Sequence, residues 1–325
     1  MKLCIATVCS ADDFQYYIPT FIYTCKRAYP KYFVKIFVKG TLSDKCRGIL
    51  KELETMCDPN WKIYENFAID YPNRVSICNT LRHLLPPNRF KDYTHLYITD
   101  VDFLIFKHNK SLGKYFAAKI KSVKQPYASV RGPTKRPSRK HINKYGWIGK
   151  YTRIADGMLM LKIPEWWNAT KKARTYYSKI VKAGTHDGHD KHPAANYREY
   201  NEVMLFRICR LSGLRTPDRK KIFLDGERIR LVYRDVHMGD FKFAHRNHKY
   251  GWIKPENFVN FEKLDRDKKW LKLLDMIGDY GYVSKMIKKI RRYTRRYHDE
   301  AMRRYKGTKR RKVHRKVPKK PKETK

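Results

Sequence analysis

The sequence predicts an α/β fold in which a mostly parallel sheet is flanked by helices. Short apolar runs, typical of strands buried on both faces, alternate with stretches of helical periodicity along the first third of the chain. Strands and helices that alternate at this spacing are typical of βαβ units. Hydrophobic residues make up 42% and aromatic residues 14% of the 325 residues, so the chain can build a large core.

The first two strand and helix pairs follow one another directly. Residues 3–9 (LCIATVC) predict a buried strand, and residues 16–29 predict a helix that Pro30 ends. Residues 32–40 predict the second strand, after which Ser43 is placed to cap a helix of about 14 residues. In a parallel sheet the polar turn that follows the first strand lies at the edge where ligands bind.

A third pair leads to the stretch that carries the chemistry. Residues 61–67 predict a strand, residues 74–85 a helix ended by two prolines, and residues 96–106 (LYITDVDFLIF) a fourth strand. This last run is apolar apart from Thr99, Asp100 and Asp102. In the alternative interpretation the strand ends at Thr99 and the two aspartates form a turn.

The two aspartates predict a metal site. Two carboxylates taken out of water one residue apart are costly unless a cation or several donors meet them. Oxygen ligands at a strand end suit Mn²⁺ or Mg²⁺, which can bridge a protein to a diphosphate. A D-x-D motif alone is weak evidence for such a site.

The later segment VHMGDFK completes the predicted site. His237 is the expected third metal ligand, Gly239 allows a close approach of the backbone, and Lys242 supplies a positive charge for phosphate. Thr7, near the end of the first strand, is expected on the same edge of the sheet. We therefore predict metal ligands at Asp100, Asp102 and His237.

Further elements are expected in the second half of the chain. The segment ADGMLMLKIPEWW contains an apolar MLML core that predicts another buried strand, and a helix is expected over residues 169–183. A loop rich in His and Asp (residues 186–192) precedes a helix over residues 199–211 that Gly213 closes.

Three regions are predicted along the chain. Residues 1–262 form the α/β domain, and residues 263–305 form a basic helical extension in which Ser284 can cap a helix. Residues 306–325 contain too few apolar side chains to fold and are expected to be a disordered basic tail.

The charge predicts a polyanionic partner. The chain has 74 Lys and Arg against 31 Asp and Glu, a formal net charge of +43. Residues 107–155 contain no acidic side chain, and residues 285–325 hold 20 Lys and Arg against 3 acids. The loop and the tail are expected to bind nucleic acid or an anionic membrane glycan.

The cysteines favour a cytoplasmic protein. Their number, seven, is odd, no CxxC pair occurs, and most lie among apolar neighbours, as expected of reduced buried thiols. No apolar stretch of about 18 residues occurs that could span a membrane. Peripheral contact with an anionic membrane or nucleic acid remains compatible with this location.

With these motifs in order, residues 1 to about 255 resemble the metal-dependent glycosyltransferases of the GT-A fold, especially the glycogenin-like retaining group. The resemblance implies a donor contact for Arg82 in NTLRHLL, on the helix before the D-x-D motif. Ala155-Asp156-Gly157 matches the family's Asn-Ala-Gly type motif, with Asp156 where Ala is usual, so Asp156 and Gly157 are expected to bind the donor. The His-x-Gly-x-x-Lys spacing is one residue tighter than the common one, and the usual Pro-Trp after the lysine is absent.

The resemblance also implies catalytic residues. Asn201-Glu202 aligns loosely with the acidic-Gln pair near the reacting sugar, where either residue would stabilise an oxocarbenium-like sugar in a retaining enzyme. In an inverting enzyme the general base would be Glu202, Glu199, Asp187 or Asp190. The expected activity is sugar transfer from a nucleotide-sugar to an acceptor hydroxyl. The alternative is a basic nucleic-acid-binding protein in which the D-x-D motif is structural.

Overall fold

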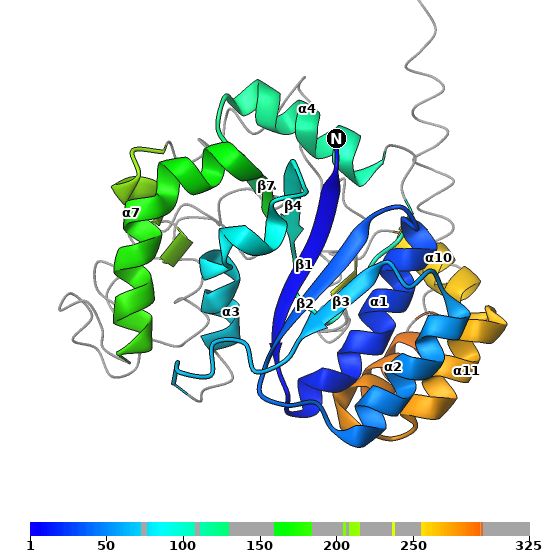
Figure 1. Cartoon of the computed structure of the whole chain (residues 1–325). Coiled ribbons are helices and arrows are strands. Elements are labelled where there is room, and N and C mark those ends of the chain that lie inside the picture. The colour runs from blue at the N-terminus through cyan, green and yellow to red at the C-terminus, as the bar shows by residue number, and fades with distance from the viewer. Residues whose placement is uncertain are drawn as a thin grey trace, which may run out of the picture.

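The computed structural model describes residues 1–72, 77–107, 111–129, 159–183, 204–205, 208–214, 236–237, 255–292 and 294. It has the expected α/β fold, with a mostly parallel sheet between two sets of helices (Figure 1). The main sheet contains β1 (Leu3–Ser10), β2 (Phe33–Lys39), β3 (Trp61–Tyr64), β4 (His95–Ile98), β6 (Tyr127–Ser129) and β7 (Leu159–Lys162).

The order of the six strands is β3-β2-β1-β4-β7-β6. The first four are mutually parallel, as the alternation of strands and helices predicts. The MLML strand, β7, runs antiparallel to both β4 and β6. The sheet is therefore mixed, and its direction reverses beside β4.

Helices cover both faces. One face packs against α1 (Tyr17–Ala28), α2 (Asp44–Met56), α4 (Leu112–Val123), α10 (Pro255–Asp265) and α11 (Lys268–Ile277). The other packs against α3 (Ile77–Leu81), the 3₁₀ segments η2 (Arg82–Leu84) and η3 (Pro87–Phe90), and α7 (Ile163–Lys182). In Figure 1, α1, α2 and α11 lie together on one side, with α3 and α7 on the other.

Local sequence signals explain several element boundaries. The Ser43 side chain accepts a hydrogen bond from the Cys46 amide (3.2 Å), so it caps α2 as expected. α7 begins at Ile163, earlier than the predicted start at residue 169, because Pro164 is well tolerated in the first helical turn. Of the helix expected over residues 199–211, the described residues 204–205 and 208–211 are helical.

The single strand predicted over residues 96–106 is wrong. β4 ends at Ile98, the chain turns at Val101 and Asp102, and β5 (Phe103–Leu104) belongs to a separate two-stranded sheet with β8 (Val236–His237). The alternative in which the two aspartates form a turn is confirmed. The physical reason is the cost of burying two carboxylates inside a sheet, which a turn at the strand end avoids.

The chain beyond residue 262 shares the core of the sheet. Trp270 in α11 is fully buried, and its ring centroid lies 5.9 Å from that of Tyr23 in α1. A further helix over residues 281–292 buries Ile287 and Ile290 in the same cluster. The apolar face of the expected extension therefore packs on the α1 side of the sheet, whereas the division of the chain at residue 262 stays a prediction.

None of the seven cysteines forms a disulfide, and six of them are buried. Within the part of the chain that the structure describes, no helix is both long and apolar enough to cross a bilayer.

Candidate active site

The candidate site lies where the sheet topology reverses. β1 has β2, the next strand in sequence, on one side and β4, a later strand, on the other. In open α/β sheets, ligands bind beyond the carboxyl ends of the strands at such a reversal. The turn after β1 and the Asp100–Asp102 segment after β4 both lie at this edge.

Asp100 is held by a buried arginine. Arg82, at the start of η2, forms an ion pair through Nη1 with Asp100 Oδ1. The Arg82 side chain is 5% exposed and that of Asp100 is 29% exposed, so the carboxylate faces outward while the guanidinium lies beneath it. Asp100 therefore has a fixed position and a neutralising partner at the strand end.

The other nitrogens of Arg82 are also engaged. Nε donates to the Asn79 carbonyl oxygen at 2.9 Å, and Nη2 donates to Asn79 Oδ1 at 2.6 Å. One turn of chain thus fixes the guanidinium plane that contacts Asp100. The donor contact expected for Arg82 stays a prediction, and the contact that the structure shows is with the Asp100 carboxylate.

Backbone pairing places His237 beside the chain segment that carries Asp102. In the small sheet, Phe103 pairs with His237 and Leu104 with Val236, in antiparallel register. Directly opposed residues of such a pair have Cα atoms about 5 Å apart, so His237 lies opposite the immediate neighbour of Asp102. Among the side chains that the structure describes, no cluster of three or more His, Cys, Asp or Glu is present, and the His237 side chain is not one of those described.

Tyr17 adds a hydroxyl group near Asp102. Its side chain is 4% exposed at the start of α1. Burial raises the pKa of the Tyr17 phenol, and the nearby Asp102 and Tyr282 raise this pKa further. The phenol therefore stays protonated at neutral pH and remains a hydrogen-bond donor.

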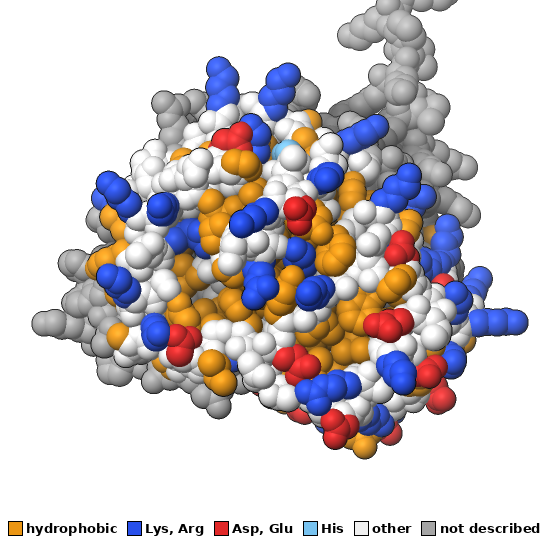
Figure 2. All heavy atoms as spheres, viewed as in Figure 1, with side chains coloured by type: hydrophobic (Ala, Val, Ile, Leu, Met, Phe, Trp, Pro, Cys, Tyr) orange, Lys and Arg blue, Asp and Glu red, His pale blue; other side chains and the backbone are white. Residues whose placement is uncertain are grey.

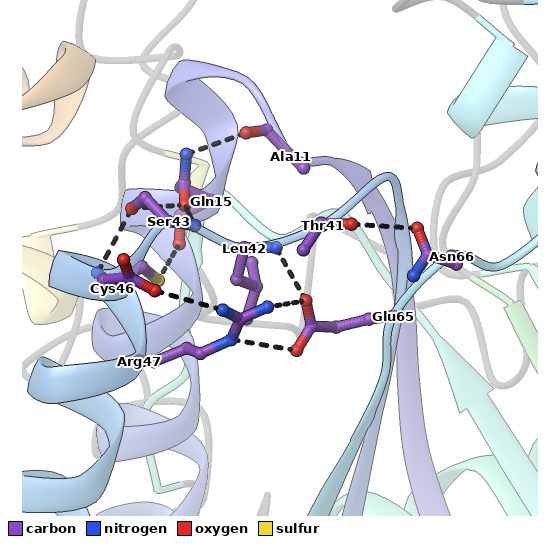
Figure 3. A network of polar contacts seen from close by, with 10 residues as sticks. Ala11, Gln15, Thr41, Leu42, Ser43, Cys46, Arg47, Glu65 and Asn66 are labelled. Carbon is purple, nitrogen blue, oxygen red and sulfur yellow. Dashed lines mark hydrogen bonds and ion pairs between the residues drawn. The ribbon is translucent and has the colours of Figure 1, made fainter.

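The loops at this edge are tied to one another by polar contacts (Figure 3). Gln15 Oε1 accepts hydrogen bonds from both the backbone nitrogen and the hydroxyl of Ser43, each at 2.8 Å. Glu65 accepts from the Leu42 amide at 2.7 Å and from Arg47 Nη2 at 2.8 Å. Hydrogen bonds therefore connect the segments that follow β1, β2 and β3, and we call the connected residues 11–15, 41–47 and 65–66 the rim.

The remaining predicted site residues divide into two groups. Thr7 is fully buried, and its hydroxyl has no hydrogen-bond partner among the described residues. Its neighbours two positions away, Ile5 and Cys9, belong to the core on the α1 side, so Thr7 faces that side. The other predicted residues lie outside the described residues: Asp156, Gly157, Asn201, Glu202, Gly239 and Lys242.

Sequence reasoning missed Asn79 and Tyr17. Asn79 and Arg82 are three residues apart within a stretch predicted to be helical, and that spacing on a helix could have indicated their contact. Tyr17 lies in an aromatic run, FQYYIPTF, where nothing distinguishes it from a core residue.

No protein-family model and no curated protein matches the sequence. Solved structures do match, among them the galactosyltransferase LgtC in complex with donor and acceptor sugar analogues, at 13% identity and a TM-score of 0.36, covering 63% of this chain and 70% of that one.

Two further matches are also glycosyltransferases. GlyE from Streptococcus pneumoniae is 11% identical, with a TM-score of 0.42 over 88% of this chain and 64% of that one. Core-mannan synthase A from Aspergillus fumigatus, in its Mn/GDP form, is 8% identical, with a TM-score of 0.39 over 63% and 69%. These three matched structures are GT-A glycosyltransferases, as the sequence resemblance predicts, but at TM-scores below 0.5 the likeness assigns no activity to this chain.

Proposed function

We propose that the protein is a metal-dependent glycosyltransferase. It transfers a sugar from a nucleotide-sugar donor to an acceptor hydroxyl, and Asp100, Asp102 and His237 hold a Mn²⁺ or Mg²⁺ at the donor diphosphate. The acceptor, or the surface on which the enzyme docks, is polyanionic.

One observation carries this proposal. The pairing of Phe103 with His237 joins two segments that are more than 130 residues apart in sequence, and it does so directly beside Asp102. Both segments meet at the carboxyl edge of the sheet, next to the reversal in strand order. A structural D-x-D motif alone gives no reason for this meeting.

The residues fit a hard divalent cation. Two carboxylates and an imidazole are donors that Mn²⁺ accepts, and Asp100 is already oriented by Arg82. When bound, such a cation neutralises the departing nucleoside diphosphate. The outward-facing Asp100 carboxylate supports this assignment, because a purely structural carboxylate needs no solvent-facing oxygen.

The other predicted residues complete the proposed site. Gly239 admits the backbone close to the diphosphate and Lys242 binds it, while Thr7, Arg82, Asp156 and Gly157 contact the donor. Glu202 or Asn201 lies near the reacting sugar. Either stabilises its positive charge in a retaining enzyme, and Glu202 takes the acceptor proton in an inverting one.

The charge of the chain supports the polyanionic partner. Lys and Arg side chains are spread over the face shown in Figure 2, with fewer acids among them, and the net charge is +43. We assign the contact to residues 107–155 and 285–325. The seven cysteines, none of which forms a disulfide, support a cytoplasmic location.

Donor hydrolysis tests the proposal. The purified protein is incubated with a panel of nucleotide-sugars and Mn²⁺ or Mg²⁺, and released nucleoside diphosphate is measured. We expect metal-dependent turnover of one donor, abolished by Asp102→Asn and retained by Asp44→Asn, whose side chain is fully exposed. No turnover with any donor would contradict the proposal.

The same variants address the alternative, a basic nucleic-acid-binding protein favoured by the charge alone. For such a protein, Asp102→Asn leaves duplex DNA binding unchanged and there is no turnover to lose. The salt dependence of binding to duplex DNA, compared with binding to anionic vesicles, identifies the polyanion.

A further inference from the structure

Arg174 is a buried cation that contacts backbone carbonyl groups. Its side chain projects from α7 and the residue is 8% exposed. Nε donates to the His83 carbonyl oxygen at 3.1 Å, Nη2 donates to the Leu85 carbonyl oxygen, and the guanidinium carbon lies 5.7 Å from the ring centroid of Trp167. Among the described residues it forms no ion pair with a carboxylate.

Such a placement is costly. Burial lowers the pKa of Arg174 to about 10, which reflects the unfavourable removal of the guanidinium from water. The carbonyls that it meets lie at the end of α3 and η2, where backbone oxygens lack partners within the helix and carry partial negative charge. Arg174 therefore caps this short helical unit from α7.

The same unit carries the partner of Asp100. Arg82 is the first residue of η2, and its guanidinium is held by Asn79 and by Asp100. Arg174 binds the carbonyl of the very next residue, His83, and that of Leu85. A shift of this segment would move Arg82, and with it the position of Asp100.

We propose that Arg174 is a positioning residue for the metal site: by fixing η2 it sets the place of Arg82, which in turn orients Asp100. This inference rests on the proposed function, because it takes Asp100, to which the contacts from α7 lead, to be a metal ligand. Substitution of a residue that hydrogen-bonds a metal ligand typically lowers the metal affinity by about 10- to 100-fold. Arg174 acts one contact further away.

Metal affinity measured without substrate tests this chain of contacts. Mn²⁺ binding is followed by calorimetry or by the electron paramagnetic resonance of free Mn²⁺. We expect Arg82→Gln to raise the dissociation constant by about 10- to 100-fold, because the lost orientation of Asp100 outweighs the removal of one nearby positive charge. We expect Arg174→Gln, which acts through Arg82, to raise it by about 3- to 10-fold. In the double variant, Arg174→Gln should add nothing to Arg82→Gln, because its route to Asp100 is already lost.

Controls separate positioning from general stability. Arg27→Gln breaks the 3.0 Å ion pair with Asp267 on the exposed side of α1, so it should lower the unfolding temperature without changing Mn²⁺ affinity. Arg174→Lys, which keeps the charge and a donor, should lie between wild type and Arg174→Gln and remains available where the Gln variant does not fold. In the metal-free protein, Arg174→Gln should also accelerate amide hydrogen exchange in residues 82–85.

Two results would overturn the inference. One is wild-type Mn²⁺ affinity, within about twofold, in folded Arg174→Gln protein, or, where that variant does not fold, an Arg174→Lys affinity equal to that of wild type. The other is an effect of Arg174→Gln that persists in the Arg82→Gln background. A wild-type protein that binds no Mn²⁺ would overturn the proposed function together with this inference, whereas normal wild-type binding with unaffected variants overturns the inference alone.

Discussion

Removal of the chain beyond residue 262 should unfold the protein. The apolar side chains that this segment buries are each at most 2% exposed and contact the same core as β1, α1 and α2; they are Leu264, Trp270, Leu273, Ile277, Val283, Ile287 and Ile290. Burial of one such side chain contributes about 1.5 to 3 kcal/mol, so the set contributes on the order of 10 to 20 kcal/mol. This is as large as the whole stability of an ordinary domain, about 5 to 15 kcal/mol.

The assay is thermal unfolding of residues 1–262, followed by near-ultraviolet circular dichroism. We expect no cooperative transition, because the exposed faces of α1 and α2 lose their cover. The single substitution Trp270→Ala should lower the free energy of unfolding of the full chain by about 3 to 5 kcal/mol. A chain that ends at residue 305, which lacks only the predicted disordered tail, serves as the control and should unfold like the full chain.

A cooperative transition in residues 1–262, within a few degrees of that of the full chain, would refute this reasoning. It would mean that the core on the α1 side is complete without the extension. The division predicted at residue 262 would then be a true domain boundary.

Three further predictions concern the rim and the thiols. Hydrogen bonding from Arg47 lowers the pKa of Glu65, so the ionised carboxylate stabilises the folded protein at pH values above its unfolded pKa. This stabilisation is lost as the pH falls through the lowered pKa. Between about pH 5 and pH 3, the unfolding temperature of Glu65→Gln should therefore fall less than that of the wild type. Ser43→Ala removes the α2 cap and the contact with Gln15. The free energy of unfolding, measured with a denaturant, should fall by about 1 kcal/mol. Burial raises the pKa of the Cys57 thiol to about 11, and the other six cysteines are buried; Ellman's reagent at pH 8 should therefore label all seven thiols only after denaturation, and rapid labelling of native protein would contradict this.

The first half of the fold could be predicted because its signals are local. The apolar run of β1, the proline after α1 and the cap at Ser43 each act within a few residues, and the structure has these elements within a few positions of the prediction. The mixed order of the sheet could not be predicted in the same way. Whether β7 runs parallel or antiparallel to β4 depends on the path of the connecting chain, which a hydrophobic pattern does not record.

The site residues that could be predicted are those whose chemistry is unusual for their place in the sequence. Two carboxylates in an apolar run are costly wherever they occur, so Asp100 and Asp102 stand out in the sequence. The turn that carries them was missed as the first choice because β5 continues the apolar pattern after a break of only a few residues. Arg82 stood out only through a family resemblance, and its contact with Asp100 depends on the three-dimensional fold.

The charge balance at Asp100 explains why an arginine would lie beside the proposed metal site. Two carboxylates would cancel the formal charge of one divalent cation, so the proposed site would carry no net positive charge toward a diphosphate. The buried Arg82 adds one positive charge, and since its guanidinium lies beneath Asp100 it does so without occupying the outward side of the carboxylate. With Arg82 the site would have a net charge of plus one when loaded, which suits an anionic donor. The same ion pair with Arg82 offsets the charge of the Asp100 carboxylate and holds it in place.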